Sequence, residues 1–378
     1  MAKLGEVCKV SASTKMIDKS KAWLLNLDMV EQQTGRVVEY NFVGEDGLNG
    51  SITQFDTENV LYSKLRPNLN KVVLPERDGF CTSELLPLRP DARKLDRSYL
   101  AVFLRSDGFV NWAVSKTAGA KMPRLGTKDL LNANIPLPEI KEQKAIAEKF
   151  KKLEQLISLR KQQLAKLDEL VKARFVEMFG DEQAFNKEPL SQNVEEMFIG
   201  PFGSSLKNEN FVSKENGYCM VYEQKHAIRK TMDVETRYID KPKYEELKRF
   251  SIHGGDIIVS CRGTIGETYI VPLNAPLGIM HPSIMKIRVK DSIYNRVFFD
   301  FLLQEKLKQH EAQANGSGVK MAVTASALGK EEFIVPSIPF QNQFAAFVER
   351  VDQQKQTVQQ SLEKLELMKK ALMQEYFG

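Results

Sequence analysis

Two long stretches of the chain carry apolar residues in alternating steps of four and three, which predicts two long helices. In the first stretch the apolar positions are Ile146, Phe150, Leu153, Ile157, Leu164, Leu167, Val171 and Met178, with Arg160 and Arg174 at the remaining steps. In the second they are Phe344, Phe347, Val351, Val358, Leu365, Met368 and Leu372, with Gln354 and Ser361 at the remaining steps. This alternation is the heptad pattern of coiled coils.

Each predicted helix needs a partner, because an uncovered heptad seam exposes a large apolar surface to water. The other helix is the economical partner. In an antiparallel pair the polar middles meet, with residues 158–163 opposite residues 356–361. One alternative stays open, in which each helix packs only on its own globular domain through a wider apolar stripe.

The chain contains an internal repeat. Ile135-Pro136-Leu137-Pro138 leads through Glu142-Gln143 into the first helix, and Val335-Pro336 leads through Asn342-Gln343 into the second. Gln143 and Gln343 are 200 residues apart, whereas the closing Gly180 and Gly378 are 198 apart, which predicts a two-residue gap between the copies. The repeat divides the chain into a first domain (1–138), a first helix (139–180), a second domain (181–337) and a second helix (338–378).

The globular domains read as α+β, because short β-rich runs alternate with turn signals and strict βαβ alternation is absent. The predicted strands are Val60–Ser63, Val72–Leu74, Ile257–Ser260 and Tyr269–Val271. A helical pattern follows at Tyr99–Val114 and at Arg296–His310, and each is followed by a loop rich in glycine and lysine. We therefore expect an α+β fold with two globular domains, two long helices in an antiparallel coiled coil and an internal pseudo-twofold repeat.

Composition and charge narrow the class of protein only slightly. The chain has 378 residues, and 54 basic against 49 acidic side chains leave a net charge of +5, which permits a polyanionic partner without requiring one. The four cysteines are scattered without a C-x-x-C pair, and no apolar stretch has the length of a signal peptide or a membrane span. These features predict a cytoplasmic protein.

The common catalytic motifs are absent from the sequence: it contains no nucleotide-binding glycine loop, no G-x-S-x-G, no H-E-x-x-H and no N-P-P-[YF] of adenine methyltransferases. Cys219, His226, His253 and Cys261 could in principle hold a metal ion, but their spacing matches no known ligand pattern, and we expect no metal. The sequence therefore predicts a protein that does no chemistry of its own.

The order of these features resembles the specificity (S) subunits of type I restriction-modification systems. That order is a globular half, Ile135-Pro136-Leu137-Pro138 with Glu142-Gln143, a heptad helix ending in Phe-Gly, and a second copy of the whole. The second copy departs from it, since Pro339 is displaced and Asn342-Gln343 replaces Glu-Gln.

The resemblance implies that the two domains are target recognition domains, each reading one half of a bipartite, asymmetric DNA sequence. It implies that the coiled coil spaces the two halves and docks two copies of a DNA-adenine methyltransferase subunit, and that ATP-dependent restriction subunits join them. It also implies that this chain carries no cofactor, because S-adenosylmethionine, ATP and Mg²⁺ belong to the partner subunits.

DNA contacts are expected at turns between strands, where cationic and amide side chains can reach phosphates or base edges. In the first domain the candidates are Lys64, Arg66, Asn68, Asn70 and Lys71, with Lys121 and Arg124 in the later loop. In the second domain they are Ser204, Ser205 and Lys207 of the Pro-Phe-Gly-Ser-Ser-Leu-Lys turn, with Arg262 and Lys320.

Two other classes of function remain open on the sequence. The first is an interaction scaffold, whose two domains bind ligands other than nucleic acid; a salt-dependent gel shift with bipartite DNA separates it from a DNA-binding subunit. The second is a self-contained hydrolase or methyltransferase, which the missing motifs disfavour and a binding assay with S-adenosylmethionine decides.

Overall fold

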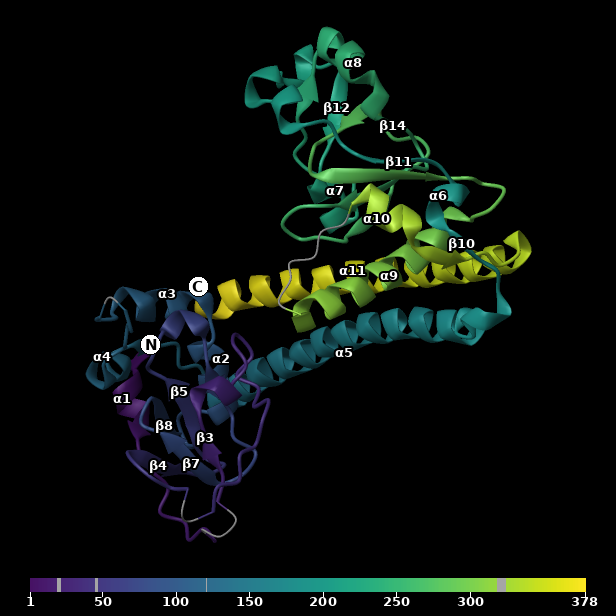
Figure 1. The fold of residues 1–378 in the computed structure, drawn as a ribbon. Helices are drawn as coiled ribbons and strands as arrows, with labels where there is room; N and C mark the ends of the chain where they lie inside the picture. The colour runs from purple at the N-terminus through teal and green to yellow at the C-terminus, as the bar shows by residue number, and fades with distance from the viewer. Residues whose placement is uncertain (19–21, 45–46, 120, 318–323) are drawn as a thin grey trace. The chain divides into compact units, whose positions relative to one another are not determined.

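The fold was analysed in a computed structural model, which describes residues 1–18, 22–44, 47–119, 121–317 and 324–378 (Figure 1). The chain divides into two compact units. Unit 1 comprises Met1–Leu164 and Thr357–Gly378, and unit 2 comprises Ala165–Gln356. Each unit therefore holds one globular domain together with part of each long helix.

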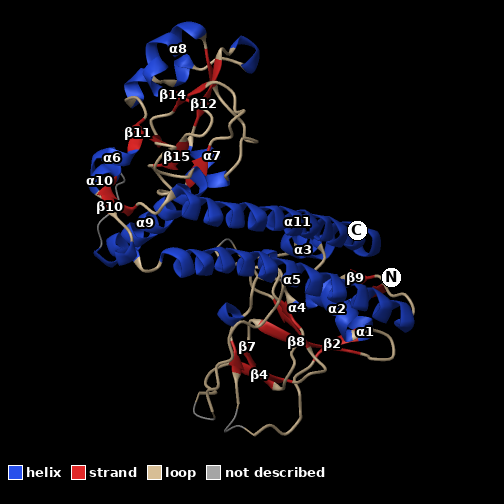
Figure 2. Cartoon of the chain, turned by 90° about the vertical axis from the view of Figure 1, so that its right-hand side faces the viewer, coloured by secondary structure: helices blue, strands red, loops and turns tan. Residues whose placement is uncertain are grey.

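Unit 1 contains two main sheets and a short strand pair. Figure 2 shows the strands in red. One sheet has the order β2-β8-β5-β6, the other β3-β7-β4, and β1 pairs with β9. The strands are β1 (Ala2–Lys3), β2 (Cys8–Val10), β3 (Leu24–Leu25), β4 (Ile52–Phe55), β5 (Val60–Ser63), β6 (Val72–Val73), β7 (Gly79–Thr82), β8 (Leu85–Pro90) and β9 (Asn134–Ile135). The helices are α1 (Leu4–Val7), α2 (Arg97–Leu104), α3 (Asp107–Ser115), α4 (Thr127–Leu131) and the first part of α5 (Ile140–Phe179).

Unit 2 repeats this plan with sheets of order β11-β18-β15-β16 and β13-β12-β17-β14, and with the pair β10-β19. The strands are β10 (Lys187–Pro189), β11 (Val194–Ile199), β12 (Cys219–Tyr222), β13 (Tyr238–Ile239), β14 (Ser251–Ile252), β15 (Ile257–Ser260), β16 (Thr268–Ile270), β17 (Gly278–Met280), β18 (Ile284–Val289) and β19 (Glu332–Ile334). The helices are α6 (Leu190–Asn193), α7 (Gln224–Arg229), α8 (Lys241–Leu247), α9 (Arg296–Ser317), α10 (Ala325–Lys330) and the first part of α11 (Ile338–Phe377).

The two domains share one topology, as the sequence repeat predicts. Strand β5 pairs antiparallel with both β6 and β8, and β15 pairs antiparallel with both β16 and β18. The register also agrees, because Ser63 lies opposite Leu85 and Ser260 lies opposite Ile284, each serine being the last residue of the central strand, β5 or β15. The α+β class and the four strands predicted in these hairpins are confirmed, with ends that shift by one residue at β6 and β16.

In each domain, a buried aspartate that precedes the central strand pairs with an arginine of a neighbouring strand. Asp56 is 1% exposed and pairs with Arg89 of β8 at 2.5 Å, and Asp256 is 1% exposed and pairs with Arg288 of β18 at 2.7 Å. Burial by itself raises the pKa of Asp56, but hydrogen bonds from Ser13 and Arg89 outweigh it and lower that pKa. The ion pair stays formed at neutral pH in consequence.

The helical pattern at Tyr99–Val114 forms two helices, where the sequence predicted a single element. Helix α2 ends at Leu104, and Ser106 begins α3 by accepting a hydrogen bond from the Phe109 backbone N–H at 3.3 Å. A serine at the N-cap satisfies a backbone donor that an unbroken helix would bond internally. In unit 2 the predicted element at Arg296–His310 is the longer helix α9, which runs to Ser317.

The first turn of each long helix is fixed by a buried glutamine. Gln143 accepts a hydrogen bond from the Asp96 backbone N–H at 2.9 Å and donates to the carbonyls of Lys94 and Pro138. Gln341 repeats this arrangement with the Asn295 N–H at 2.8 Å and the carbonyls of Ile293 and Pro336. Both glutamines are 0% exposed.

The residue equivalent to Gln143 is therefore Gln341, and the predicted match with Gln343 is wrong. Gln343 is exposed and has no share in this arrangement. Gln341 follows Gln143 by 198 residues, the same spacing as between Gly180 and Gly378, so the expected two-residue gap in the helices disappears. Phe340-Gln341, which differs from Asn342-Gln343, stands where the first copy has Glu142-Gln143.

The two long helices pair antiparallel, which is seen inside each unit. In unit 1, Lys149 bonds to Tyr376 at 3.0 Å, and Arg160 of the polar middle bonds to Ser361 at 3.2 Å. In unit 2, the ammonium group of Lys355 lies 2.6 Å from a carboxylate oxygen of Asp168. The packing of a helix on its own domain is also present, because Ile146 and Phe150 belong to the core of unit 1.

The seam of α5 is confirmed, but the predicted seam of α11 is wrong at every second step. Val348 and Leu362 are buried at 9% and 6% exposure, whereas Met368 is 54% exposed and Gln354 is exposed. The α11 positions that match the α5 seam across 198 residues are Phe344, Val348, Val351, Lys355, Val358, Leu362, Leu365, Lys369 and Leu372.

Lysines account for two of the four steps at which the predicted α11 seam is wrong, whereas the apolar Val348 and Leu362 occupy the seam at the other two. Lys355 and Lys369 occupy seam positions with their side chains only 28% exposed, and their ammonium groups pair with Asp168 and with Glu154 at 2.8 Å. The aliphatic part of a lysine covers apolar surface while its charge stays at the rim. An apolar count treats such a lysine as polar and therefore selects the neighbouring residues.

The last turn of each helix completes a domain core. Phe377 of α11 packs on Tyr99 and Phe103 of unit 1, with ring centroids 5.3 and 5.9 Å apart. Phe179 of α5 packs on Phe298 of α9 in unit 2 at 4.8 Å. Each globular core is thus closed by the helix that ends the other copy of the sequence repeat. In the described part of the chain, no helix is both long enough and apolar enough to span a membrane.

The glutamine at each helix start gives the first prediction. Replacing Gln341 with leucine removes three hydrogen bonds and leaves two carbonyls without their donor, so we expect the free energy of unfolding to fall by about 2–4 kcal/mol. The matched control is Gln343→Leu, which alters an exposed glutamine two residues away and is expected to change it by less than about 0.5 kcal/mol. Urea unfolding of both variants measures the difference, and equal losses would contradict the assignment of Gln341.

Candidate nucleic-acid interface

In the first domain, two candidate loops meet beyond the end of β5. The Arg66 backbone N–H donates to the Pro123 carbonyl at 2.8 Å, and the Leu125 N–H donates to the Lys64 carbonyl at 2.9 Å. These bonds bring Lys64 and Arg66 beside the loop that carries Lys121 and Arg124. The side chains of Arg66, Asn68 and Lys121 are exposed, and Lys64 is half-buried.

Arg66 is held in an unusual backbone conformation. Its φ angle is 49°, in the left-handed region that residues other than glycine seldom adopt. Such conformations cost free energy and occur where the surrounding structure fixes the backbone, often at functional sites. Here the bond to Pro123 supplies that constraint, and the guanidinium group projects into solvent.

Three of the candidates already have partners inside the domain. Asn70 is 7% exposed and donates hydrogen bonds to the Gln33 side chain at 3.2 Å and to the Arg105 carbonyl at 3.0 Å. Lys71 donates to the Leu27 carbonyl, and burial lowers its pKa against the opposing effect of Asp28.

Arg124 is exposed, but it forms an ion pair with Glu84 at 3.0 Å, and the hydrogen bonds of that pair raise its pKa. A DNA phosphate would have to compete with Glu84 for this guanidinium group. Among the described residues of this edge, Lys64, Arg66 and Lys121 are therefore the candidate cations that form no ion pair.

In the second domain, sheet topology brings the candidates to one edge. Strands β11 and β15 both pair antiparallel with β18, so they run in the same direction and end at the same edge of the sheet. Ser204, Ser205 and Lys207 follow β11, and Arg262 follows β15. Ser204, Lys207 and Arg262 are exposed, and Ser205 is half-buried. Lys320 lies outside the described residues.

The loop after β11 has a fixed base. The Gly200 N–H donates to the Ile284 carbonyl at 3.0 Å, and Pro201 is buried. A Cβ atom on Gly200 would lie 2.3 Å from the His281 carbonyl oxygen, so only glycine allows this close approach. Residues 202–205 then turn outward, and the Ser205 N–H closes the turn on the Phe202 carbonyl at 2.8 Å.

A charged cluster that the sequence prediction missed lies next to this edge. Glu223 is 9% exposed and pairs with Arg237 and with Lys225, the latter at 2.8 Å. Burial alone would raise the pKa of Glu223, but these two cations lower it, so the carboxylate is ionised. Arg237 also stacks over the Phe211 ring at 3.9 Å.

His281 belongs to the same neighbourhood. Burial lowers its pKa, and the charges of Arg237, Arg262 and Lys225 act in the same direction, while Glu223 opposes them. The imidazole is therefore neutral at pH 7, and its Nδ1 atom lies 2.8 Å from the Ser283 hydroxyl. No local motif signals this cluster, because Glu223 follows β12, Arg237 precedes β13 and His281 lies between β17 and β18.

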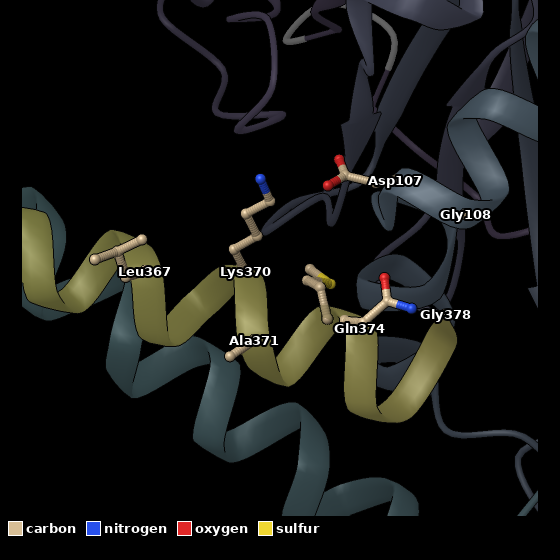
Figure 3. A pocket seen from close by; sticks show the side chains of 8 residues that line it. Asp107, Gly108, Leu367, Lys370, Ala371, Gln374 and Gly378 are labelled. Atoms are coloured by element: carbon tan, nitrogen blue, oxygen red, sulfur yellow. The ribbon is translucent and has the colours of Figure 1, made fainter.

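The part of α11 that belongs to unit 1 carries exposed apolar side chains and two grooves. One groove of about 320 Å³ lies where α3 begins and α11 ends, and Leu367, 67% exposed, forms part of its wall (Figure 3). A second groove of about 320 Å³ follows α11 past Met368. Leu156 and Leu159 of α5 are also exposed, at 45% and 57%. Among the described residues, no group of histidine, cysteine and carboxylate side chains could hold a metal ion.

Comparisons with known proteins all indicate one family. A family model described as the type I restriction modification DNA specificity domain matches residues 1–169 and 204–367. The EcoDI specificity subunit of Escherichia coli is 30% identical over 124 residues, which are 33% of this chain and 27% of that protein. The MjaVIII specificity subunit of Methanocaldococcus jannaschii is 32% identical over 81 residues, which are 21% of this chain and 19% of that protein.

These two matches span less than a third of either curated relative. A solved structure of a type I restriction-modification S subunit from M. genitalium has the same fold. It covers 100% of this chain and 95% of its own, with a TM-score of 0.56 and 16% sequence identity.

The two asparagines of the first-domain loop give the second prediction. Asn70→Ala removes two hydrogen bonds and places alanine at a φ of 51°, so we expect a loss of about 2 kcal/mol in the free energy of unfolding. Asn68→Ala changes an exposed side chain in the same turn and is expected to cost less than about 0.5 kcal/mol. Denaturant unfolding checks both, and a stable Asn70→Ala protein would return Asn70 to the group of free surface residues.

Proposed function

We propose, from the premise that this chain belongs to the type I restriction-modification DNA specificity family, that it recognises a bipartite duplex DNA target. Each domain presents cationic side chains at one edge of the same duplicated sheet. That recurrence carries the proposal, because a scaffold for unrelated ligands has no need of basic turns at equivalent positions. Lys64 and Arg66 follow β5, and Arg262 follows β15.

The two halves of the target differ, since the two edges carry different side chains on one scaffold. The first domain offers Lys64, Arg66, Asn68 and Lys121, whereas the second offers two serines, Lys207 and Arg262. Cations and serine hydroxyls bind phosphates, while arginine and asparagine can also form paired hydrogen bonds with base edges in the major groove. An asymmetric, two-part DNA sequence follows from this difference.

The chain itself supplies no chemistry in this proposal. Its sequence holds neither a nucleotide-binding loop nor an adenine methyltransferase motif. Methyl transfer and ATP-driven cleavage belong to partner subunits, which bind S-adenosylmethionine, ATP and Mg²⁺. The chain selects the DNA on which those subunits act in the cytoplasm.

The methyltransferase subunit docks on the helix pair. The groove along α11 is lined by Thr357, Gln360, Ser361, Lys364, Leu365 and Met368, and the 54% exposed Met368 is its apolar contact. Exposed apolar side chains gathered on a helix surface are typical of protein interfaces. Leu170 of α5 is 198 residues before Met368 and is 47% exposed, which fits one docking position in each copy of the repeat.

The third prediction tests DNA recognition. Arg66→Ala is expected to weaken binding to one half of the target, and Arg262→Ala to the other half, by about 1–3 kcal/mol each if the arginine reads a base. The measurement is competition binding with duplexes that carry changes in only one half. Loss of affinity that is the same for both halves would reject the division of labour, and no salt-dependent binding to any duplex would favour the scaffold.

The fourth prediction tests docking. The chain alone is expected to transfer no methyl group to DNA, and activity is expected to appear when methyltransferase subunits are added. Met368→Glu places a charge in the groove and is expected to weaken that association at least tenfold, since an ion loses hydration in an apolar contact.

Val38→Glu is the matched control for this experiment, because Val38 is 55% exposed in the same unit but lines neither of the two grooves beside α11. Calorimetric titration with the methyltransferase subunit measures both variants. Methylation by the chain alone, or equal association of the two variants, would contradict the proposal.

A further inference from the structure

The loop after the first strand of the four-stranded sheet in unit 2 carries an apolar side chain almost completely in water. Phe202 follows β11 and is 86% exposed. Among the large apolar side chains of the described residues, only Met16 is more exposed. The loop of Met16 is tied to Asp56, before β5 begins, and so lies at the other end of its sheet from Lys64 and Arg66.

Phe202 stands on an anchored loop. The base of this loop is held by Gly200 and Pro201, and a Cβ atom on Gly203 would have open space on every side. A fixed base with an apolar tip differs from a loop that is polar and mobile throughout.

Folding gives no reason for an exposed phenylalanine at this place. Burying such a ring stabilises a folded chain, and Phe202 forgoes almost all of that stabilisation. The polar groups around it point to a nucleic-acid ligand, because Ser204 and Lys207 follow in the same loop and Arg262 projects from the same sheet edge.

We propose that Phe202 is an apolar wedge that enters the base stack of the half-site read by the second domain. Serine, lysine and arginine hold the phosphates, and the projecting ring inserts between neighbouring base pairs and partly unstacks them. DNA-bending proteins use phenylalanine side chains in this manner. The second domain then reads how easily its half-site unstacks, in addition to reading base edges. The inference rests on the proposed DNA recognition and adds a residue that acts without hydrogen bonding.

The test uses the full chain and a duplex that carries its bipartite target, mapped by methylation sequencing, with 2-aminopurine placed in one half-site at a time. Unstacking raises 2-aminopurine fluorescence, and we expect the natural chain to raise it in the half-site read by the second domain. Phe202→Ala is expected to abolish this rise and to weaken binding to that half-site about tenfold. Phe202→Trp is expected to retain the rise.

Leu273→Ala is the matched control, because Leu273 is 78% exposed in unit 2 but follows β16, at the opposite edge of the sheet. It is expected to change neither fluorescence nor affinity. Thermal unfolding is expected to be unchanged in Phe202→Ala, since the ring is not part of the core.

Different failures point to different conclusions. Specific binding by the natural chain without a fluorescence rise would overturn the wedge and leave the proposed function intact. An affinity loss in Phe202→Ala that thymine-to-uracil replacement reproduces would assign Phe202 to a thymine methyl group in the major groove and would also overturn the wedge. Equal binding of the natural chain to target and unrelated duplexes would overturn the proposed function itself, and the wedge with it.

Discussion

Each globular core depends on a phenylalanine from the far end of a long helix. Phe377 is packed on Tyr99 and Phe103 in unit 1, and Phe179 is packed on Phe298 in unit 2. A domain therefore reaches its full core only when the helix that follows the other domain has reached it. Burial of one aromatic side chain contributes about 1.5–3 kcal/mol, a large part of the net stability of a domain of this size. This constraint makes the helix pair a part of both domains, and it explains why the pairing must be antiparallel.

The buried glutamines Gln143 and Gln341 fix the start of each long helix. Gln143 and Gln341 each join three backbone groups that lie before and beside the helix start, so the helix leaves its domain at a fixed residue. Each long helix has 40 residues, so Phe179 and Phe377 lie at equal distances from the starts of their helices. A one-residue shift of either start would turn the seam by about 100° and remove the terminal phenylalanine from its core. The equal spacing of 198 residues therefore reflects a packing requirement as well as the history of the repeat.

The sequence predicted the repeat, the α+β class, the heptad seam of α5 and the hairpins of both domains, because each is written in the period of apolar residues. The sequence prediction failed where a polar side chain covers apolar surface or fixes the backbone through buried hydrogen bonds. Lys355 and Lys369 lie in the α11 seam through their aliphatic stems, so the predicted phase selected Gln354 and Met368. Gln341 and Gln343 cannot be told apart by type, and only the burial of Gln341 separates them.

The sequence likewise predicted only part of the candidate site. Turn residues between predicted strands could be found, since glycine, proline and cationic residues mark such turns. The sequence could not tell that Asn70 is turned inward or that Arg124 is held by Glu84, because these contacts join residues 37 and 40 positions apart. The cluster of Glu223, Arg237 and His281 depends on strands of two sheets, and no single stretch of sequence contains it.

In the proposed function, a duplicated scaffold with unlike edges solves a physical problem of DNA recognition. The chain has a net charge of only +5, which gives little general attraction to DNA, so discrimination must come from a few fixed contacts. Rigid loop bases supply that fixity: Gly200 is pressed against the His281 backbone, and Arg66 is held at a positive φ by Pro123. The bases of these loops are part of the fold of each domain, whereas the loop tips are not. Side chains at the tips can therefore change without loss of the core. The weak general attraction then becomes an advantage, since a subunit that binds every duplex tightly would conceal the differences that its tips detect.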